Sequence, residues 1–195
     1  MGELNLHNLN SVIDKFKCTQ FVETGTGKGT GLSYACSHGF NKLYSIEYMT
    51  ELYEECKGKF DEDVRVTLIN DTSINGLKQV LSEMDSTPAL FWLDAHFPGA
   101  DFYFNDYDHM KDDESHMPLV QELQLIHSSR EGCEDVIILD DLQLYEDGPF
   151  QLHNPEFCAK YGNKDITPGT DLFKETHQFS RDYRHQGFLT LTPNE

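Results

Sequence analysis

The sequence predicts an α/β fold built around a doubly wound, mostly parallel sheet with helices on both faces. Three observations support this prediction: strand-like and helix-like segments alternate along the chain, two strand-like segments are apolar throughout, and polar residues gather where strands end. Apolar residues make up 38% of the 195 residues, which is enough for a buried core. The length fits a single domain over 1–195.

Six strands and four helices are expected along the chain. The strands are expected at 17–23, 42–48, 64–70, 88–96, 135–141 and 183–193. The helices are expected at 31–39, 49–60, 74–84 and 117–129. The segments 88–96 and 135–141 are continuous apolar runs, which indicates strands covered on both faces at the centre of the sheet. Such sheets bind ligands at the carboxyl ends of their strands, so the polar residues there are the candidates for a functional site.

The segment after the first strand, ETGTGKG (23–29), is a glycine-rich turn. A turn of this kind between a strand and a helix lets the backbone approach a ligand closely. Its spacing matches neither the GxxxxGK[ST] motif of nucleoside triphosphate sites nor the GxGxxG motif of dinucleotide sites. The pattern that remains is acid-x-Gly-x-Gly-x-Gly, formed by Glu23, Gly25, Gly27 and Gly29.

Acidic residues end the second and third expected strands. Glu47 follows Gly27 by twenty residues, a spacing at which a carboxylate can accept hydrogen bonds from both hydroxyls of a ribose. The alternative for Glu47 is an ordinary solvated glutamate. Asp71 either contacts the adenine side of a cofactor or caps the helix that follows it.

Three carboxylates, Asp94, Asp140 and Asp141, end the two apolar strands. Carboxylates that converge at one sheet edge repel one another, so they need a cation or raised pKa values. Oxygen ligands of this kind suit Mg²⁺, Mn²⁺ or Ca²⁺ better than zinc. Zinc is a weaker alternative, because no HxH or HxxxH spacing joins the three histidines of this region, His96, His109 and His116.

These motifs resemble those of class I S-adenosylmethionine-dependent methyltransferases. The strand-end acids resemble the metal-dependent small-molecule O-methyltransferases, and the Asp140–Asp141 pair is most similar to the macrocin and related sugar O-methyltransferases. The resemblance covers most of the chain, with its strongest matches at the glycine turn, Asp94 and the aspartate pair. It implies a Rossmann-like fold with a mostly parallel, seven-stranded sheet whose last strand is antiparallel.

The resemblance also implies a role for each matched residue. S-adenosylmethionine would lie along the turn and the strand-end acids, on Glu23, Thr24, Gly25, Gly27, Gly29, Glu47 and Asp71. Mg²⁺ or Mn²⁺ would be held by Asp94, Asp140 and Asp141.

His96 is the position where this chain departs from the sugar enzymes. Those enzymes use an aspartate as the base two residues beyond the first metal ligand, and His96 stands at that position here. Alternation along a strand would place His96 on the same side as Asp94, and a neutral imidazole accepts a proton readily. His96 with Asp94 is therefore the expected catalytic pair. The alternatives for His96 are a structural role and an added metal ligand.

The expected activity is S-adenosylmethionine-dependent and divalent-metal-dependent methyl transfer to a hydroxyl of a small polar acceptor, foremost a sugar or glycan. One alternative is a non-catalytic cofactor-binding protein of the same fold. Another is an NAD-dependent oxidoreductase, which the missing GxGxxG motif disfavours. Two long stretches, 97–116 and 146–182, are expected to be irregular and to serve as lids over the site.

Charge and composition limit the binding partners and the cellular compartment that we expect for this protein. A formal net charge of -19 repels nucleic acid and anionic membranes, so neither is an expected partner. No apolar run approaches the ~18 residues of a membrane span, and the N-terminus has no signal-peptide layout. Five cysteines without a CxxC pair favour a reduced, cytoplasmic setting. A homodimer is compatible with the sequence.

Overall fold

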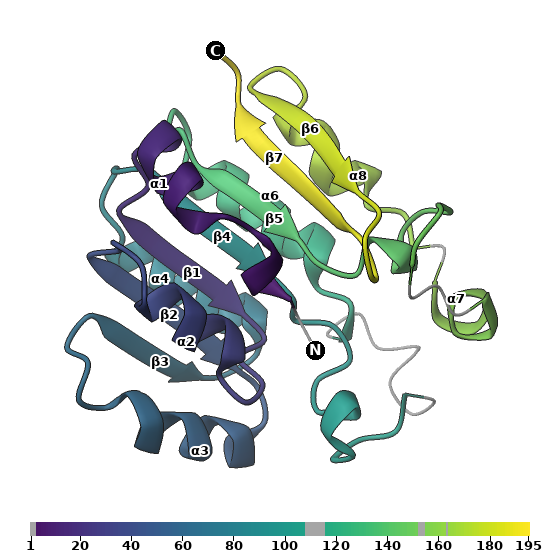
Figure 1. Cartoon of the computed structure of the whole chain (residues 1–195), viewed down its shortest axis with the longest axis horizontal. Coiled ribbons are helices and arrows are strands. Elements are labelled where there is room, and N and C mark those ends of the chain that lie inside the picture. The colour runs from purple at the N-terminus through teal and green to yellow at the C-terminus, as the bar shows by residue number, and fades with distance from the viewer. Residues whose placement is uncertain (1–2, 108–115, 152–154, 163) are drawn as a thin grey trace.

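A seven-stranded sheet in the order β3-β2-β1-β4-β5-β7-β6 forms the centre of the computed structural model, which describes residues 3–107, 116–151, 155–162 and 164–195 (Figure 1). The strands are β1 Gln20–Thr24, β2 Lys42–Glu47, β3 Val66–Asn70, β4 Ala89–Leu93, β5 Val136–Leu139, β6 His177–Asp182 and β7 Phe188–Pro193. Strands β1 to β5 pair in parallel, whereas β7 pairs antiparallel with both β5 and β6. The expected mostly parallel sheet of seven strands with an antiparallel last strand is thereby confirmed.

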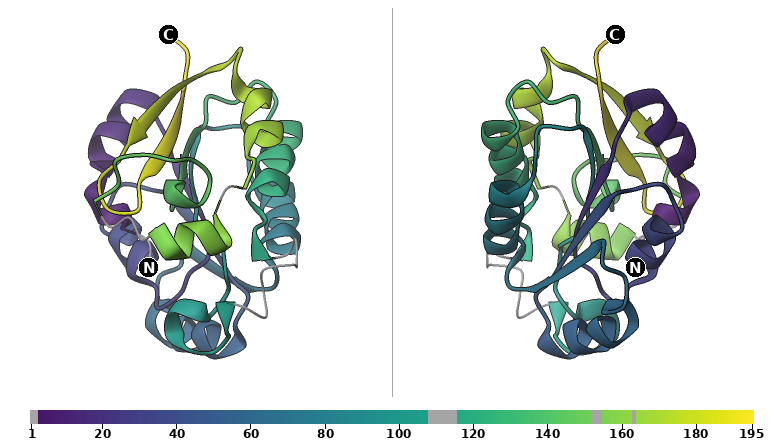
Figure 2. Two further views of the ribbon diagram at one scale, coloured as in Figure 1. Left: turned by 90° about the vertical axis from the view of Figure 1, so that its right-hand side faces the viewer. Right: turned by 90° about the vertical axis from the view of Figure 1, so that its left-hand side faces the viewer.

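Helices cover both faces of this sheet. The longer helices are α1 Leu9–Phe16, α2 Thr30–Cys36, α3 Thr50–Phe60, α4 Ser73–Glu83, α6 Leu119–Ser129, α7 Pro155–Tyr161 and α8 Thr167–Thr170. Short 3₁₀ turns are η1 Leu4–Leu6, η2 Ala100–Phe102, η4 Leu142–Leu144 and η5 Asp171–Phe173. Figure 2 shows the sheet edge-on, with α1 and α2 on one face and α4 and α6 on the other. The doubly wound arrangement follows from this distribution.

Alternating side chains of the central strands supply the two layers of the core. Every residue of β1, β4 and β5 is buried, because helices cover both faces of these strands. Phe21 and Trp92 pack with α1 and α2, whereas their neighbours Val22 and Phe91 pack with α4 and α6. The fully apolar segments of the sequence are therefore the central strands.

The segment 146–182 differs from the expectation of an irregular stretch. It contains α7, α8, η5 and the edge strand β6. The sequence of β6, HQFSRD, is mostly polar because this strand lies at the sheet edge, where half of its residues are exposed. Its pairing with β7 holds it in place, and that pairing is not visible in its own sequence.

A buried ion pair joins several elements at the amino ends of the strands. Arg130 Nη2 lies 2.8 Å from Asp135 Oδ1, and both side chains are 4% exposed. Asp135 also accepts a hydrogen bond from the backbone nitrogen of Ala89, and its backbone carbonyl lies 3.0 Å from His177 Nε2. The pair therefore links the starts of β4, β5 and β6.

Among the described residues, no helix is both long and apolar enough to cross a membrane. All five cysteines are free thiols.

Candidate functional site

The glycine turn after β1 packs directly against the segment that follows β4. Gly25 has φ +83°, and a Cβ atom placed there would lie 2.5 Å from the carbonyl oxygen of Asp94. Gly27 has φ +55°, and a Cβ atom there would lie 3.0 Å from the ring of Phe102. Only glycine meets both the backbone angle and the close approach at Gly25. The glycine turn and the segment after β4 therefore pack against each other, and both line the same cleft.

Glu47, at the end of β2, is fixed to this turn. Its Oε2 accepts a hydrogen bond from the backbone nitrogen of Gly27 at 2.7 Å, and its Oε1 accepts one from Met49 at 2.7 Å. Burial raises the pKa of the Glu47 carboxyl, while the bonds from Met49 and Gly27 lower it. Each carboxylate oxygen keeps a second lone pair, so Glu47 can still accept hydrogen bonds from a ligand.

Glu23 lies deeper, at the end of β1. Its side chain accepts a hydrogen bond from Ser45 Oγ at 2.6 Å and is 1% exposed. Burial raises the pKa of Glu23 to about 8. Glu23 therefore forms the floor of the site, beneath the turn.

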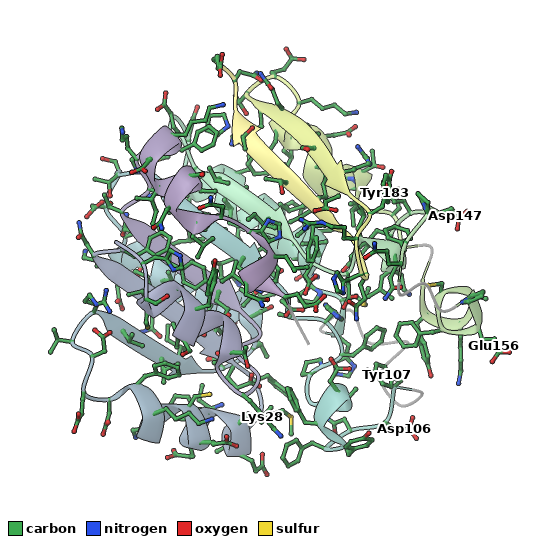
Figure 3. The ribbon with its side chains drawn as sticks, viewed as in Figure 1. Lys28, Asp106, Tyr107, Asp147, Glu156 and Tyr183 are labelled. Carbon is green, nitrogen blue, oxygen red and sulfur yellow. The ribbon has the colours of Figure 1, made fainter. Side chains whose placement is uncertain are left out.

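One cleft, with about 930 Å³ of space that is continuous with solvent, connects these groups. Its lining includes Glu23, Gly25, Thr26, Gly27, Lys28, Thr30, Gly31, Ile46, Glu47, Tyr48, Leu52, Thr72, Ser73, Trp92, Asp94, Ala95, His96, Phe97, Pro98, Gly99, Asp101, Phe102 and His116. Lys28 and Tyr107 both lie beyond the arrowheads of β1 and β4, at the end of the sheet where ligands of such folds bind (Figure 3).

Three residues expected at the cofactor do not line this cleft. Thr24 is fully buried, and its carbonyl accepts a hydrogen bond from the backbone nitrogen of Asp94. Gly29, with φ +79°, is the residue before α2. Asp71 accepts hydrogen bonds from the backbone nitrogen of Thr72 and the side chain of Asn75, but the residue that caps α4 is Thr72, whose hydroxyl accepts a hydrogen bond from the backbone nitrogen of Asn75. Contact of these residues with a cofactor stays a prediction.

At the carboxyl ends of β4 and β5, Asp94, His96 and Asp141 come together. One possible ligand atom from each lies within 4.8 Å of the others. His96 Nδ1 is 3.5 Å from Asp94 Oδ1, and His96 Nε2 is in direct contact with Asp141 Oδ2. Strand β4 ends at Leu93, so the premise that Asp94 and His96 share a strand is wrong, and a loop brings them together instead.

Asp140 and Asp141 occupy different places. Asp141 has φ +50°, a strained conformation that turns its side chain toward His96, and its Oδ1 accepts a hydrogen bond from Gln143 at 3.2 Å. Asp140 is 5% exposed, and its Oδ1 accepts a hydrogen bond from the backbone nitrogen of Asp141 at 2.9 Å. Asp140 is outside the group of three, and its role as a metal ligand stays a prediction.

The charges of this cluster act strongly on one another. Burial raises the pKa of Asp94 and of Asp140, and neighbouring carboxylates raise both further. Burial lowers the pKa of His96, but Asp141, Asp94 and Asp140 together raise it to about 10. A base must be neutral, so the expected role of His96 as the base requires another cation to neutralise these carboxylates. Two carboxylates and one imidazole are also a donor set that fits a divalent ion.

Several cleft residues were not expected from the sequence. Ser73 and Tyr48 line the cleft next to predicted strand ends, but neither residue type carries a distinctive signal.

An aromatic cluster lies beside the cleft. Phe97, Tyr107 and Tyr161 pack edge to face or tilted, and thereby join the segment after β4 to α7. Tyr103 is 97% exposed. Of the three histidines considered for zinc, His109 lies outside the described residues.

The chain has the fold of the class I S-adenosylmethionine-dependent methyltransferases, as its similarity to solved structures shows. The antiparallel β7, inserted between β5 and β6, distinguishes the sheet from the strand order 3-2-1-4-5-6 of dinucleotide-binding folds.

Three of these neighbours illustrate the match. A candidate caffeoyl-CoA O-methyltransferase from Staphylococcus aureus aligns with TM-score 0.62 and 11% identity, over 100% of this chain and 85% of its own. An O-methyltransferase from Bacillus cereus, solved in complex with SAH, aligns with TM-score 0.53 and 14% identity, over 95% and 79%. A candidate O-methyltransferase from Klebsiella pneumoniae aligns with TM-score 0.51 and 16% identity, over 96% and 78%.

The amino-acid sequence alone gives no such match. No protein-family model matches the chain, and no curated protein matches it either. At 11 to 16% identity the structural similarity establishes the fold.

Proposed function

We propose that this chain transfers a methyl group from S-adenosylmethionine to a hydroxyl oxygen of a small polar acceptor, foremost a sugar or glycan. The observation that carries the proposal is the continuity of one cleft. Gly27 and Glu47 line it at the end expected to bind the cofactor, and Asp94 and His96 line it at the end expected to react. Donor and acceptor can therefore meet inside a single cleft, as an in-line displacement requires.

Charge supports a cationic methyl donor. Glu47 and Asp101 line the cleft, and a sulfonium carries the charge opposite to that of their carboxylates. Among the described residues of the lining, Lys28 is the one lysine, and there is no arginine. Phosphate groups are usually held by arginine or lysine, so this lining favours an acceptor without phosphates. A neutral polyol fits better than a nucleotide sugar or a coenzyme A thioester.

The reaction can be written with every atom assigned. The acceptor oxygen attacks the methyl carbon, an O–C bond forms, and the C–S bond breaks with its electron pair going to sulfur. The sulfonium thereby becomes the neutral thioether S-adenosylhomocysteine. The hydroxyl proton passes to the cluster of Asp94, His96 and Asp141 and from there to solvent.

The residues of the cluster would hold a divalent ion between the two strand ends. The chemistry that such an ion supplies is a lowered pKa of a hydroxyl bound to it. The segment 97–116 and helix α7 remain our candidates for lids, since Phe97 and His116 line the cleft and α7 packs on Phe97 through Tyr161. The rest of 146–182 includes β6, which is part of the sheet.

Two measurements test the proposal. Isothermal titration should show binding of S-adenosylhomocysteine and none of NAD. Release of S-adenosylhomocysteine from S-adenosylmethionine should then depend on an added diol or sugar, and chelation by EDTA should abolish that release. Cofactor binding without turnover on any sugar, polyol or catechol in a broad panel would favour the non-catalytic alternative. Binding of NAD in place of the adenosyl compound would overturn the proposal.

A further inference from the structure

We propose that Asp94, His96 and Asp141 form a mixed nitrogen–oxygen site for a first-row transition ion such as Mn²⁺, Fe²⁺ or Co²⁺, and that His96 sets this preference over Mg²⁺. The inference deepens the proposed function and rests on it only in treating the cleft as an active site. It changes two expected roles. His96 becomes a metal ligand instead of the base, and Asp140 is no longer one of the ligands.

The geometry provides three donors from two neighbouring strand ends. Asp94 and His96 follow β4, Asp141 follows β5, and the last residues of the two strands, Leu93 and Leu139, are paired in register. The donor atoms lie within 4.8 Å of one another, which a single ion can bridge with modest side-chain movement. The side chains of all three residues are 13% exposed, so water or an acceptor can reach the remaining coordination positions.

Neighbouring residues also fix the positions of Asp94 and Asp141 by hydrogen bonds and close packing. The backbone nitrogen of Asp94 donates to the carbonyl of Thr24 at 3.1 Å, and Gly25 packs against the Asp94 carbonyl. Gln143, a buried residue, donates to Asp141 Oδ1 at 3.2 Å and leaves Oδ2 directed at His96. Outer hydrogen bonds of this kind orient the ligands of metal sites.

Donor chemistry then selects the ion. Mg²⁺ is a hard ion that prefers oxygen ligands in near-ideal octahedral geometry. Imidazole suits iron, zinc, copper and nickel, and affinity for such mixed sites rises from Mn²⁺ through Fe²⁺ and Co²⁺. Replacing one carboxylate of an all-oxygen site by His96 therefore lowers the relative affinity for Mg²⁺. The family resemblance led us to expect Mg²⁺ or Mn²⁺. The donor set of this site favours a transition ion over Mg²⁺, and Mn²⁺ satisfies both expectations.

The test measures metal binding itself. Tag-free protein is stripped with a chelator and desalted. It is then titrated by calorimetry with Mg²⁺, Ca²⁺, Mn²⁺ and Co²⁺ at 150 mM salt, on the order of physiological ionic strength, which screens diffuse binding to the acidic surface. We expect Mn²⁺ and Co²⁺ to bind at least ~10-fold more tightly than Mg²⁺, as a nitrogen ligand predicts. The visible absorption of bound Co²⁺ should report a nitrogen ligand that His96→Ala removes.

Two variants separate the role of His96 from general effects. His96→Asp restores an all-carboxylate set and should reduce the Mn²⁺-over-Mg²⁺ preference by at least ~10-fold. His127→Asp makes the same change at an exposed position on α6 and should leave the preference unchanged. Binding of S-adenosylhomocysteine and the thermal midpoint check that each variant is folded.

Equal or tighter binding of Mg²⁺ by the unaltered protein would overturn the inference, as would Co²⁺ affinity that survives His96→Ala. If S-adenosylhomocysteine binds while no ion does, the inference and the expected loss of turnover with EDTA both fail, and only the cofactor part of the proposed function stands. If ions bind as expected and S-adenosylhomocysteine does not, the proposed function fails and the metal site stands.

Discussion

The carboxylate of Glu47 accepts a hydrogen bond from the backbone nitrogen of Gly27, with 2.7 Å between Oε2 and the nitrogen. These two residues come from the ends of β2 and β1, which are parallel neighbours in the sheet. The bond ties the strand-end acid to the glycine turn, so Glu47 and the turn together form one corner of the cleft.

Removing this corner should weaken cofactor binding. Glu47→Ala should raise the Kd for S-adenosylhomocysteine by roughly 10- to 150-fold, which corresponds to about 1.5–3 kcal/mol for lost hydrogen bonds to a charged group. Calorimetry measures the change. Glu62→Ala removes the same charge at an exposed position of the α3–β3 turn and should leave the Kd unaltered. An equal affinity in Glu47→Ala and the unaltered protein would show that Glu47 does not contact the cofactor.

Gly25→Ala should disrupt the contact between the turn and β4. The new Cβ would lie 2.5 Å from the Asp94 carbonyl oxygen, and the φ of +83° adds backbone strain of about 1–2 kcal/mol. We expect a lower thermal midpoint together with at least ~10-fold weaker binding of S-adenosylhomocysteine, since the whole turn must shift.

Gly132→Ala is the matched control for this change. Gly132 has φ +79°, but no atom lies within 4 Å of the added Cβ. This variant should lose only the stability that backbone strain costs. It should bind S-adenosylhomocysteine as tightly as the unaltered protein does. If both variants lose the same stability and neither loses affinity, the close approach of Gly25 to Asp94 has no functional consequence.

Glu122 should make stability depend on pH. This residue of α6 is 1% exposed, and burial raises its pKa from 4.5 to about 7. The folded protein therefore holds a proton that the unfolded chain releases, so this group's contribution lowers stability as pH rises from about 4.5 to about 7. Glu122→Gln should remove that contribution and gain on the order of 1–3 kcal/mol over the unaltered protein at pH 8.

Urea unfolding at about pH 5, near the lower end of this window, and at about pH 8, above it, measures the difference. Glu131→Gln, at an exposed site, should show the same pH dependence as the unaltered protein. A Glu122→Gln variant with an unchanged pH dependence would mean that Glu122 is already ionised in the folded state.

The Arg130–Asp135 pair should matter for stability and not for the site. Asp135→Asn leaves a buried guanidinium without its counter-charge, so unfolding should become easier by about 3–5 kcal/mol. Affinity for S-adenosylhomocysteine should be retained where the protein is folded, because the pair lies at the amino ends of the strands. Glu55→Gln breaks the exposed pair with Lys59 and should leave the free energy of unfolding nearly unchanged, because water and salt screen such a pair. Similar losses in the two variants would contradict the stabilising role of the buried pair.

The centre of the sheet could be predicted from the sequence. The apolar runs around Phe91 and Ile138 are buried on both faces, so their hydrophobicity is continuous and the parallel centre of the sheet could be predicted. The glycines of the turn could be recognised because positive φ angles and close backbone contacts leave no room for a side chain at Gly25. The cleft is built around these same features.

Which acids join the cluster at His96, and which strand forms the edge of the sheet, depend on contacts between distant parts of the chain. Adjacent residues such as Asp140 and Asp141 look alike in sequence, but the positive φ of Asp141 turns its carboxylate toward His96 while Asp140 bonds back to the chain. Strand β6 is polar and half exposed, so its identity depends on its partner β7 and not on its own pattern. Local propensity determines what is buried, whereas the direction of a strand-end side chain is set by backbone conformation and by contacts made across the fold.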